Sequence, residues 1–175
     1  MAATVLAALS MTPWFYASTK AYVVGVPYST MTRHPNWKAA MRYVRAHARS
    51  GDVVIASFAL LARYYGPPLP LYHLNNNMLD IILRDNLRDG QGRLLEYTSG
   101  APAITDLATL RTVLGDHRGA WFVTEKFRFH SPTPTPIEIR EYIEATCQLW
   151  PVAVAPDMII WYCRRSATVS SPSPG

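Results

Sequence analysis

Four residues of types that bind small ligands follow two predicted strands. Arg63 and Tyr65 come shortly after the apolar run 53–56, and His73 and Asn75 stand at the end of the next extended segment. In open α/β sheets, ligands bind beyond the carboxyl ends of the strands. A guanidinium group, an aromatic ring, an imidazole and an amide at that edge would suit a sugar or a phosphate. These residues therefore form a candidate ligand site.

A structural role for the same stretch is the interpretation that the sequence favours. Tyr64 and Tyr65 would pack the connection between the two strands, and the three asparagines at 75–77 would begin the next helix. Both interpretations place the residues at one edge of a sheet, and they differ in whether a ligand binds there.

The sequence has no motif for catalysis, metal binding or cofactor binding. SFALL follows the first strand at 57–61, whereas a dinucleotide fold needs glycines there so that the backbone can approach a pyrophosphate. No glycine-rich loop ends in Lys-Ser/Thr, and no serine or cysteine has the context of a nucleophile elbow. The five histidines are far apart in sequence, and the acidic residues are scattered. We therefore predict no catalytic residue, no metal site and no cofactor.

The elements that position the candidate site form a β-α-β unit. The unit runs from Gly51 to Leu74, with strands at 52–57 and 69–74 separated by a short helical turn and the Pro67-Pro68 break. The continuous apolar run 53–56 is typical of a parallel strand that helices cover on both faces.

The same alternation of helices and strands continues to the end of the chain. A 3.6-residue apolar period and an Asn36 N-cap predict a helix at 36–49. Thr135, Pro136 and Glu138 predict a capping box at the start of another helix. The remaining predicted elements are a helix at 78–87, a weak strand at 94–99, a turn at 100–102, a helix at 105–114, a strand at 120–124, a stiff extended segment at 130–136, a helix at 136–149 and a hairpin of 152–155 with 158–164. The order predicts an α/β fold with an open, mainly parallel sheet, helices on both faces in a Rossmann-like three-layer arrangement, and a C-terminal β-hairpin.

The ends of the chain differ in composition from its centre. Residues 1–18 carry no charge and are expected to be a membrane-helix remnant, with Trp14, Phe15 and Tyr16 at the membrane interface. An N-terminal core helix is the alternative. Residues 19–35 are a predicted linker, 36–165 the α/β domain and 166–175 a disordered polar tail.

The charge and the cysteines leave the surroundings of the protein open. The formal charge of +5 is mild for 175 residues, and it favours a solvated surface or a membrane surface over nucleic acid. Cys147 and Cys163 match no metal or redox spacing. They would pair in an oxidising compartment, and the default expectation is two reduced core residues.

Three segments together resemble a known family. They are NWKAAMRYVRAHARSGDVVIAS from residue 36, LRTVLGDHRGAWFVT from residue 110 and MIIWYCRR from residue 158. With the uncharged start, they resemble the C-terminal soluble domain of multi-spanning membrane glycosyltransferases that use polyprenyl-phosphate sugars, of the protein mannosyltransferase and aminoarabinose transferase type. The similarity covers roughly residues 10 to 165.

The resemblance implies a location, partners and a lack of activity. It implies a periplasmic or extracellular domain beside a membrane, with the membrane surface or the membrane-embedded transferase portion as partner and a lipid-linked sugar as a further candidate partner. The catalytic acids of that family lie in an early extracytoplasmic loop that this sequence does not contain, so no catalytic residue is carried over. The alternative is a freestanding soluble ligand binder or enzyme that uses the cleft near Tyr65 and His73.

Overall fold

The computed structural model describes residues 35–74, 87–130, 135–151, 153 and 155–165. The chain divides into two units, Met1–His34 and Pro35–Gly175, and all described residues belong to the second. The predictions for 1–34, 75–86 and 166–175, which include Trp14, Phe15, Tyr16 and Asn75, lie outside the described residues. None of the described helices is both long enough and apolar enough to span a membrane.

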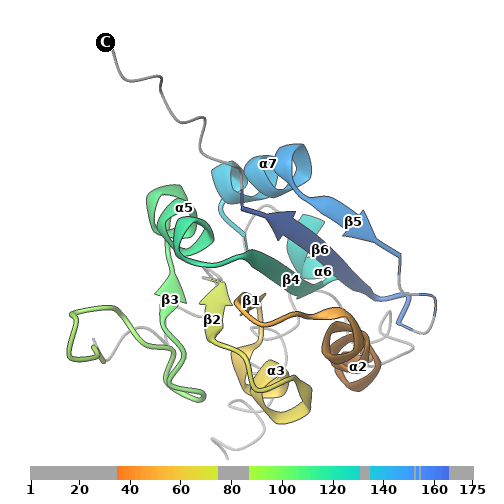
Figure 1. Cartoon of the computed structure of the whole chain (residues 1–175), viewed down its shortest axis with the longest axis horizontal. Helices are drawn as coiled ribbons and strands as arrows, with labels where there is room; N and C mark the ends of the chain where they lie inside the picture. Colours follow the sequence, from red (N-terminus) through yellow and green to blue (C-terminus); the bar gives the residue numbers. More distant parts are fainter. Residues whose placement is uncertain (1–34, 75–86, 131–134, 152, 154, 166–175) are drawn as a thin grey trace, which may run out of the picture. The chain divides into compact units, whose positions relative to one another are not determined.

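Helices and strands alternate along the described chain, as predicted (Figure 1). In order they are α2 (Trp37–His47), β1 (Asp52–Ala56), α3 (Ala59–Tyr65), β2 (Leu71–Leu74), β3 (Ala103–Ile104), α5 (Leu107–Asp116), β4 (Gly119–Glu125), α6 (Lys126–His130), α7 (Ile137–Thr146), β5 (Gln148–Trp150) and β6 (Met158–Arg164).

The strands form one six-stranded sheet in the order β3-β2-β1-β4-β6-β5. The four strands β3, β2, β1 and β4 are parallel, and β6 and β5 are added antiparallel to their neighbours. The order of the strands reverses between β1 and β4: β2 and β3 lie on one side of β1, and the later strands lie on the other. The predicted fold class, including the C-terminal hairpin, is confirmed.

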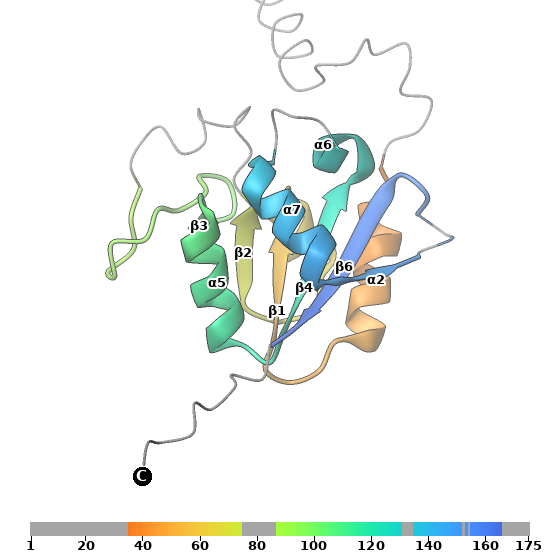
Figure 2. The same cartoon turned by 90° about the horizontal axis from the view of Figure 1, so that it is seen from above.

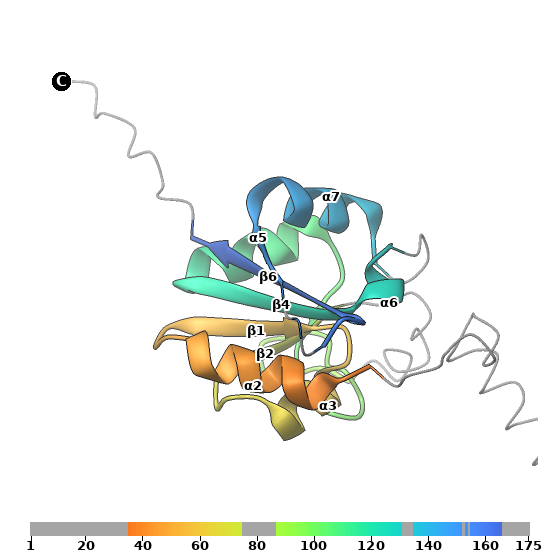
Figure 3. The same ribbon diagram turned by 90° about the vertical axis from the view of Figure 1, so that its right-hand side faces the viewer.

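The helices form a layer on each face of the sheet (Figures 2 and 3). Alternate residues of β1 explain the two layers, since Val53 and Ile55 belong to the core beneath α5 and α7, and Val54 and Ala56 to the core beneath α2 and α3. All five residues of β1 are buried. A central parallel strand therefore reads as a continuous apolar run.

The first helix follows its sequence signals closely. Asn36 is its N-cap and accepts a hydrogen bond from the backbone of Ala39 at 3.0 Å. The buried residues of α2 are Trp37, Ala40, Met41 and Val44, the predicted apolar stripe. Gly51, after the helix, has a φ of 86°, which glycine adopts without strain.

The predicted end of α7 and the first strand of the hairpin are wrong. The helix ends at Thr146, and Cys147 is already extended, with φ −108° and ψ 153°. The strand is β5 at 148–150, paired with β6, and not 152–155. Proline has no backbone N–H to donate to a strand ladder. Strand β5 therefore ends before Pro151, whereas the predicted strand began after it.

The predicted capping box before α7 is also wrong. Pro136, with φ −50° and ψ 133°, is the N-cap residue and provides no side-chain cap, and Thr135 is buried. Because the ψ of Pro136 is extended, the helix begins one residue later than predicted.

Two other segments differ from the prediction. Leu94 and Leu95 make only isolated bridges in place of the strand at 94–99, and the strand β3 forms just beyond, at 103–104. The carboxylate of Glu96 accepts hydrogen bonds from the backbones of Thr98 and Ser99, and such local bonds compete with a strand ladder. Lys126–His130 is a short helix, α6, that was not predicted.

Candidate functional site

The carboxyl edge of the parallel strands is the first candidate site, because the sheet reverses its growth there between β1 and β4. His73, near the end of β2, lies in register between Ala56 of β1 and Ala103 of β3. It is only 1% exposed, and neither of its ring nitrogens has a hydrogen-bond partner among the described residues. Ser57, directly after β1, is also buried, and its hydroxyl has no partner within the described part of the chain.

The surroundings of His73 keep its imidazole neutral. Burial lowers the pKa of His73 to about 4, because a charged ring would lose its hydration. The negative charge of Glu96 opposes this shift and the positive charge of Arg128 adds to it. The imidazole is therefore a neutral group with one donor and one acceptor nitrogen at pH 7.

Two further buried carboxylates at this edge are engaged in hydrogen bonds. Glu125, the last residue of β4, accepts from Trp37 Nε1 at 3.0 Å and forms an ion pair with Arg128. Glu96 accepts from the backbones and hydroxyls of Thr98 and Ser99, and these hydrogen bonds outweigh its burial and lower its pKa. Sequence reasoning did not single out Glu96, Glu125 or Arg128, and only the position of Glu125 at the end of an apolar run signalled a role.

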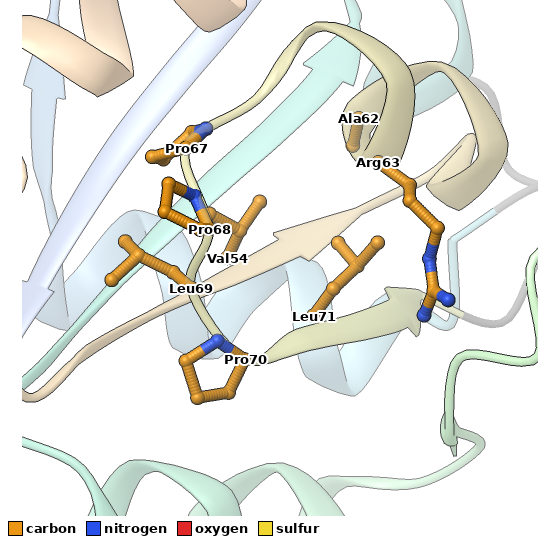
Figure 4. A pocket seen from close by; sticks show the side chains of 8 residues that line it. All are labelled: Val54, Ala62, Arg63, Pro67, Pro68, Leu69, Pro70 and Leu71. Carbon is orange, nitrogen blue, oxygen red and sulfur yellow. The ribbon is translucent and has the colours of Figure 1, made fainter.

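The other predicted site residues do not join His73 in one hollow. Arg63 lines a shallow hollow of about 330 Å³, bordered by Val54, Leu71 and the segment 67–70 (Figure 4). Neither Tyr65 nor His73 lines it. The side chain of Tyr65 packs against the core, and Arg45 donates to the backbone carbonyls of Tyr65 and Gly66 at 2.9 and 2.7 Å. The packing role predicted for Tyr64 and Tyr65 is therefore observed for Tyr65 alone, because Tyr64 is 78% exposed.

The opposite edge of the sheet holds a polar network that sequence reasoning missed. Asp52 begins β1 and is 1% exposed. Its carboxylate accepts from the backbone N–H of Arg49 at 2.9 Å, from Trp121 Nε1 at 3.1 Å and from the Tyr162 hydroxyl at 3.2 Å. The sequence did contain a signal for this network, namely an aspartate directly before an apolar run. A carboxylate buried at that position requires hydrogen-bond donors around it.

The polar side chains at these sites can donate or accept hydrogen bonds. In the described part of the chain no three residues of the types His, Cys, Asp and Glu are grouped so that they would hold a metal ion. Glu96 and Glu125 are already hydrogen-bonded, and His73 is closed off from solvent.

Comparison with protein-family models gives no match, and comparisons with curated proteins and with solved structures give none either.

Proposed function

We propose that residues 36–165 form a non-catalytic, extracytoplasmic domain of a membrane glycosyltransferase that uses a lipid-linked sugar as donor. The domain would pack on the membrane-embedded portion of that enzyme and help to shape its acceptor site. The proposal rests on the resemblance of three segments of the sequence to that family. The disulfide between Cys147 and Cys163 and the burial of side chains at the carboxyl edge of the sheet support it.

The disulfide between Cys147 and Cys163 is the observation that carries the proposal. It links the residue after α7 to strand β6. Disulfides form and persist in secreted and extracytoplasmic proteins and are rare in reducing compartments. This bond replaces the default expectation of two reduced cysteines, and it favours the side of the membrane that the resemblance implies.

The burial of the described polar side chains at the carboxyl edge supports the non-catalytic part of the proposal. An enzyme of this fold class would need an open crevice beyond the ends of β1 and β4. Ser57, His73 and Glu125 at or near the strand ends are all buried. The fold is then best suited to present its outer surfaces to a partner.

Fractionation of native cell material with an antibody against residues 36–165 tests the proposal. A membrane-bound band much larger than 19.6 kDa is expected, and its two cysteines should resist alkylation until a reductant is added. A soluble band at 19.6 kDa, or cysteines that alkylate at once, would contradict it.

A second candidate function is a freestanding protein that binds a small polar ligand at the carboxyl edge. Within the described residues, the hydroxyl of Ser57 and both ring nitrogens of His73 have no hydrogen-bond partner, and this favours the second function because buried polar atoms without partners are uncommon. Addition of glucose 1-phosphate should then shift the imidazole NMR signals of His73, and His73→Gln should weaken binding without lowering the melting temperature. A fall in stability with no effect on binding would exclude this function.

A further inference from the structure

The opposite, amino-terminal edge of the parallel strands contains a basic hollow. The hollow has a volume of about 380 Å³. Four arginines line it: Arg49, Arg118, Arg164 and Arg165. They come from three separate segments, namely the loop from α2 to β1, the loop from α5 to β4 and the end of β6, which converge at one end of the sheet (Figure 2).

Backbone hydrogen bonds hold these segments together. Arg118 donates its N–H to the carbonyl of Gly51 at 2.9 Å, and Arg165 donates its N–H to the carbonyl of Arg118 at 3.1 Å. Strand register also places Asp52 beside Gly119, and Gly119 beside Arg164. The convergence of the arginines is therefore built by the sheet and does not depend on their side chains.

Few negative charges oppose these arginines. Among the described residues, the side-chain ion pairs are Arg93 with Asp89 and Arg128 with Glu125, so none of the four arginines is in one. The nearby carboxylate of Asp52 is buried and already accepts three hydrogen bonds. Like charges held close together repel one another, and a bound anion would relieve that repulsion.

The rest of the lining is aromatic. Trp121, Trp150 and Tyr162 line the hollow, and Trp121 lies 4.5 Å from Tyr162 and 6.0 Å from Trp150 between ring centroids. Trp150 Nε1 is buried and has no hydrogen-bond partner among the residues that the structure describes. Guanidinium groups recognise phosphate oxygens, and aromatic rings stack against sugar or base rings.

We propose that this hollow binds a phosphorylated small molecule, with its phosphate or diphosphate on the arginines and its organic part against the aromatic side chains. A volume of about 380 Å³ is in the range of small-molecule sites. A flat basic patch, in contrast to this hollow, would suit a partner with an extended surface. The inference does not rest on the proposed function, since it concerns the opposite edge of the sheet.

Thermal unfolding of the full chain in inorganic pyrophosphate tests the proposal. At a concentration about 100 times the dissociation constant, the melting temperature should rise by roughly 5 °C or more. The double variant Arg118→Gln/Arg164→Gln should lose this shift. Without pyrophosphate, the variant should melt at a temperature close to that of the unmodified protein, because both side chains are exposed. This control shows that the variant folds.

A matched variant with the same change of charge separates a site from general electrostatics. Lys38→Gln/Arg42→Gln removes two exposed positive charges from α2 that do not line the hollow. It should keep the full pyrophosphate shift. An equal loss in both double variants, or no shift in the unmodified protein, would overturn the proposal.

A vesicle experiment distinguishes a free phosphorylated ligand from a lipid headgroup. The full chain, the hollow variant Arg118→Gln/Arg164→Gln and the matched variant Lys38→Gln/Arg42→Gln are sedimented with vesicles of phosphatidylcholine and phosphatidic acid. If pyrophosphate abolishes the sedimentation, and only the hollow variant fails to sediment, the phosphate that the hollow binds belongs to a lipid headgroup. No sedimentation, with the thermal shift retained, assigns it to a free ligand. Sedimentation that pyrophosphate does not compete away would overturn the small-ligand proposal in favour of a membrane-facing surface.

Discussion

His73 and Asp52 are buried to the same extent, and their hydrogen bonding is opposite. Both are 1% exposed, but the carboxylate of Asp52 accepts three hydrogen bonds while the imidazole of His73 has none among the described residues. A carboxylate can remain charged in the interior when donors surround it, whereas an imidazole without partners remains neutral. These two side chains are therefore expected to respond differently to substitution.

Acidification should destabilise the protein through His73. The pKa of His73 is about 4 in the folded protein against 6.5 for the unperturbed group, so between these pH values the unfolded chain takes up a proton that the folded chain does not. The contribution of His73 to stability is full above pH 6.5 and falls, by up to about 3 kcal/mol, as the pH decreases to 4. Urea unfolding at pH 7, 5.5 and 4.5 measures this slope.

Two variants check the assignment of the slope to His73. His73→Leu should flatten it, and His130→Gln, which changes an exposed histidine, should leave it as it is. Glu96 affects stability in a lower pH range than His73. Hydrogen bonds from Ser99 and Thr98 lower the pKa of Glu96, so its contribution to the free energy of unfolding is lost only as the pH falls below the usual pKa range of a glutamate. An unchanged slope in His73→Leu would mean that another group titrates.

Removing the carboxylate of Asp52 should cost more than removing one of its partners. Asp52→Ala leaves three donors without their acceptor, including the buried Trp121 Nε1, and should lower the free energy of unfolding by about 2–4 kcal/mol. Tyr162→Phe removes a single hydrogen bond and should cost about 1 kcal/mol. Urea unfolding of both variants gives the comparison, and equal costs would contradict the role of Asp52 as the shared acceptor.

At the scale of elements, the pairing of β4 with β6 depends on a glycine. A Cβ atom at Gly119 would overlap the hydroxyl of Tyr162 and lie 2.7 Å from its Cζ. Gly119→Ala should therefore destabilise the protein by about 1–3 kcal/mol through overpacking. Gly115→Ala, near the end of α5, meets no atom within 4 Å and should be neutral or stabilising by up to about 1 kcal/mol. Similar melting temperatures for the two variants would contradict this packing.

The disulfide adds a covalent link to the packing of α7 on the sheet, which Ile139 and Ile143 of α7 also provide. Cys147 and Cys163 are 16 residues apart, and a crosslink over such a loop stabilises a protein by about 3 kcal/mol. Cys147→Ala/Cys163→Ala should lose about this free energy of unfolding in urea. Dithiothreitol should lower the stability of the unmodified protein similarly and leave the double variant unchanged. Two free thiols in the non-reduced protein would contradict the bond.

Taken as a whole, the described residues form two buried cores of their own. One core lies under α5 and α7 and another under α2 and α3, with the sheet between them. Residues 35–165 expressed alone should therefore unfold in one cooperative transition, with coincident changes in circular dichroism and tryptophan fluorescence. A chain that shows no such transition would mean that the fold needs residues outside this range.

The fold class could be predicted from the sequence, because the signals involved are local. A continuous apolar run such as 53–56 needs cover on both faces, and a 3.6-residue apolar stripe such as that of α2 needs one buried side. The element ends that the sequence predicted wrongly, at Thr135 and at 148–155, lie beside prolines and the disulfide, where tertiary pairing decides which residue leaves the helix.

Only the tertiary structure decided which polar residues share a site. Arg49, Arg118 and Arg164 are separated by dozens of positions in sequence and line one hollow because β1, β4 and β6 are neighbours in the sheet. His73 and Arg63 are ten positions apart, and strand register buries the first while the second stays exposed. Sequence spacing predicts helices and strands through local periodicity, but it does not encode which strands become neighbours, and that choice assembles the site.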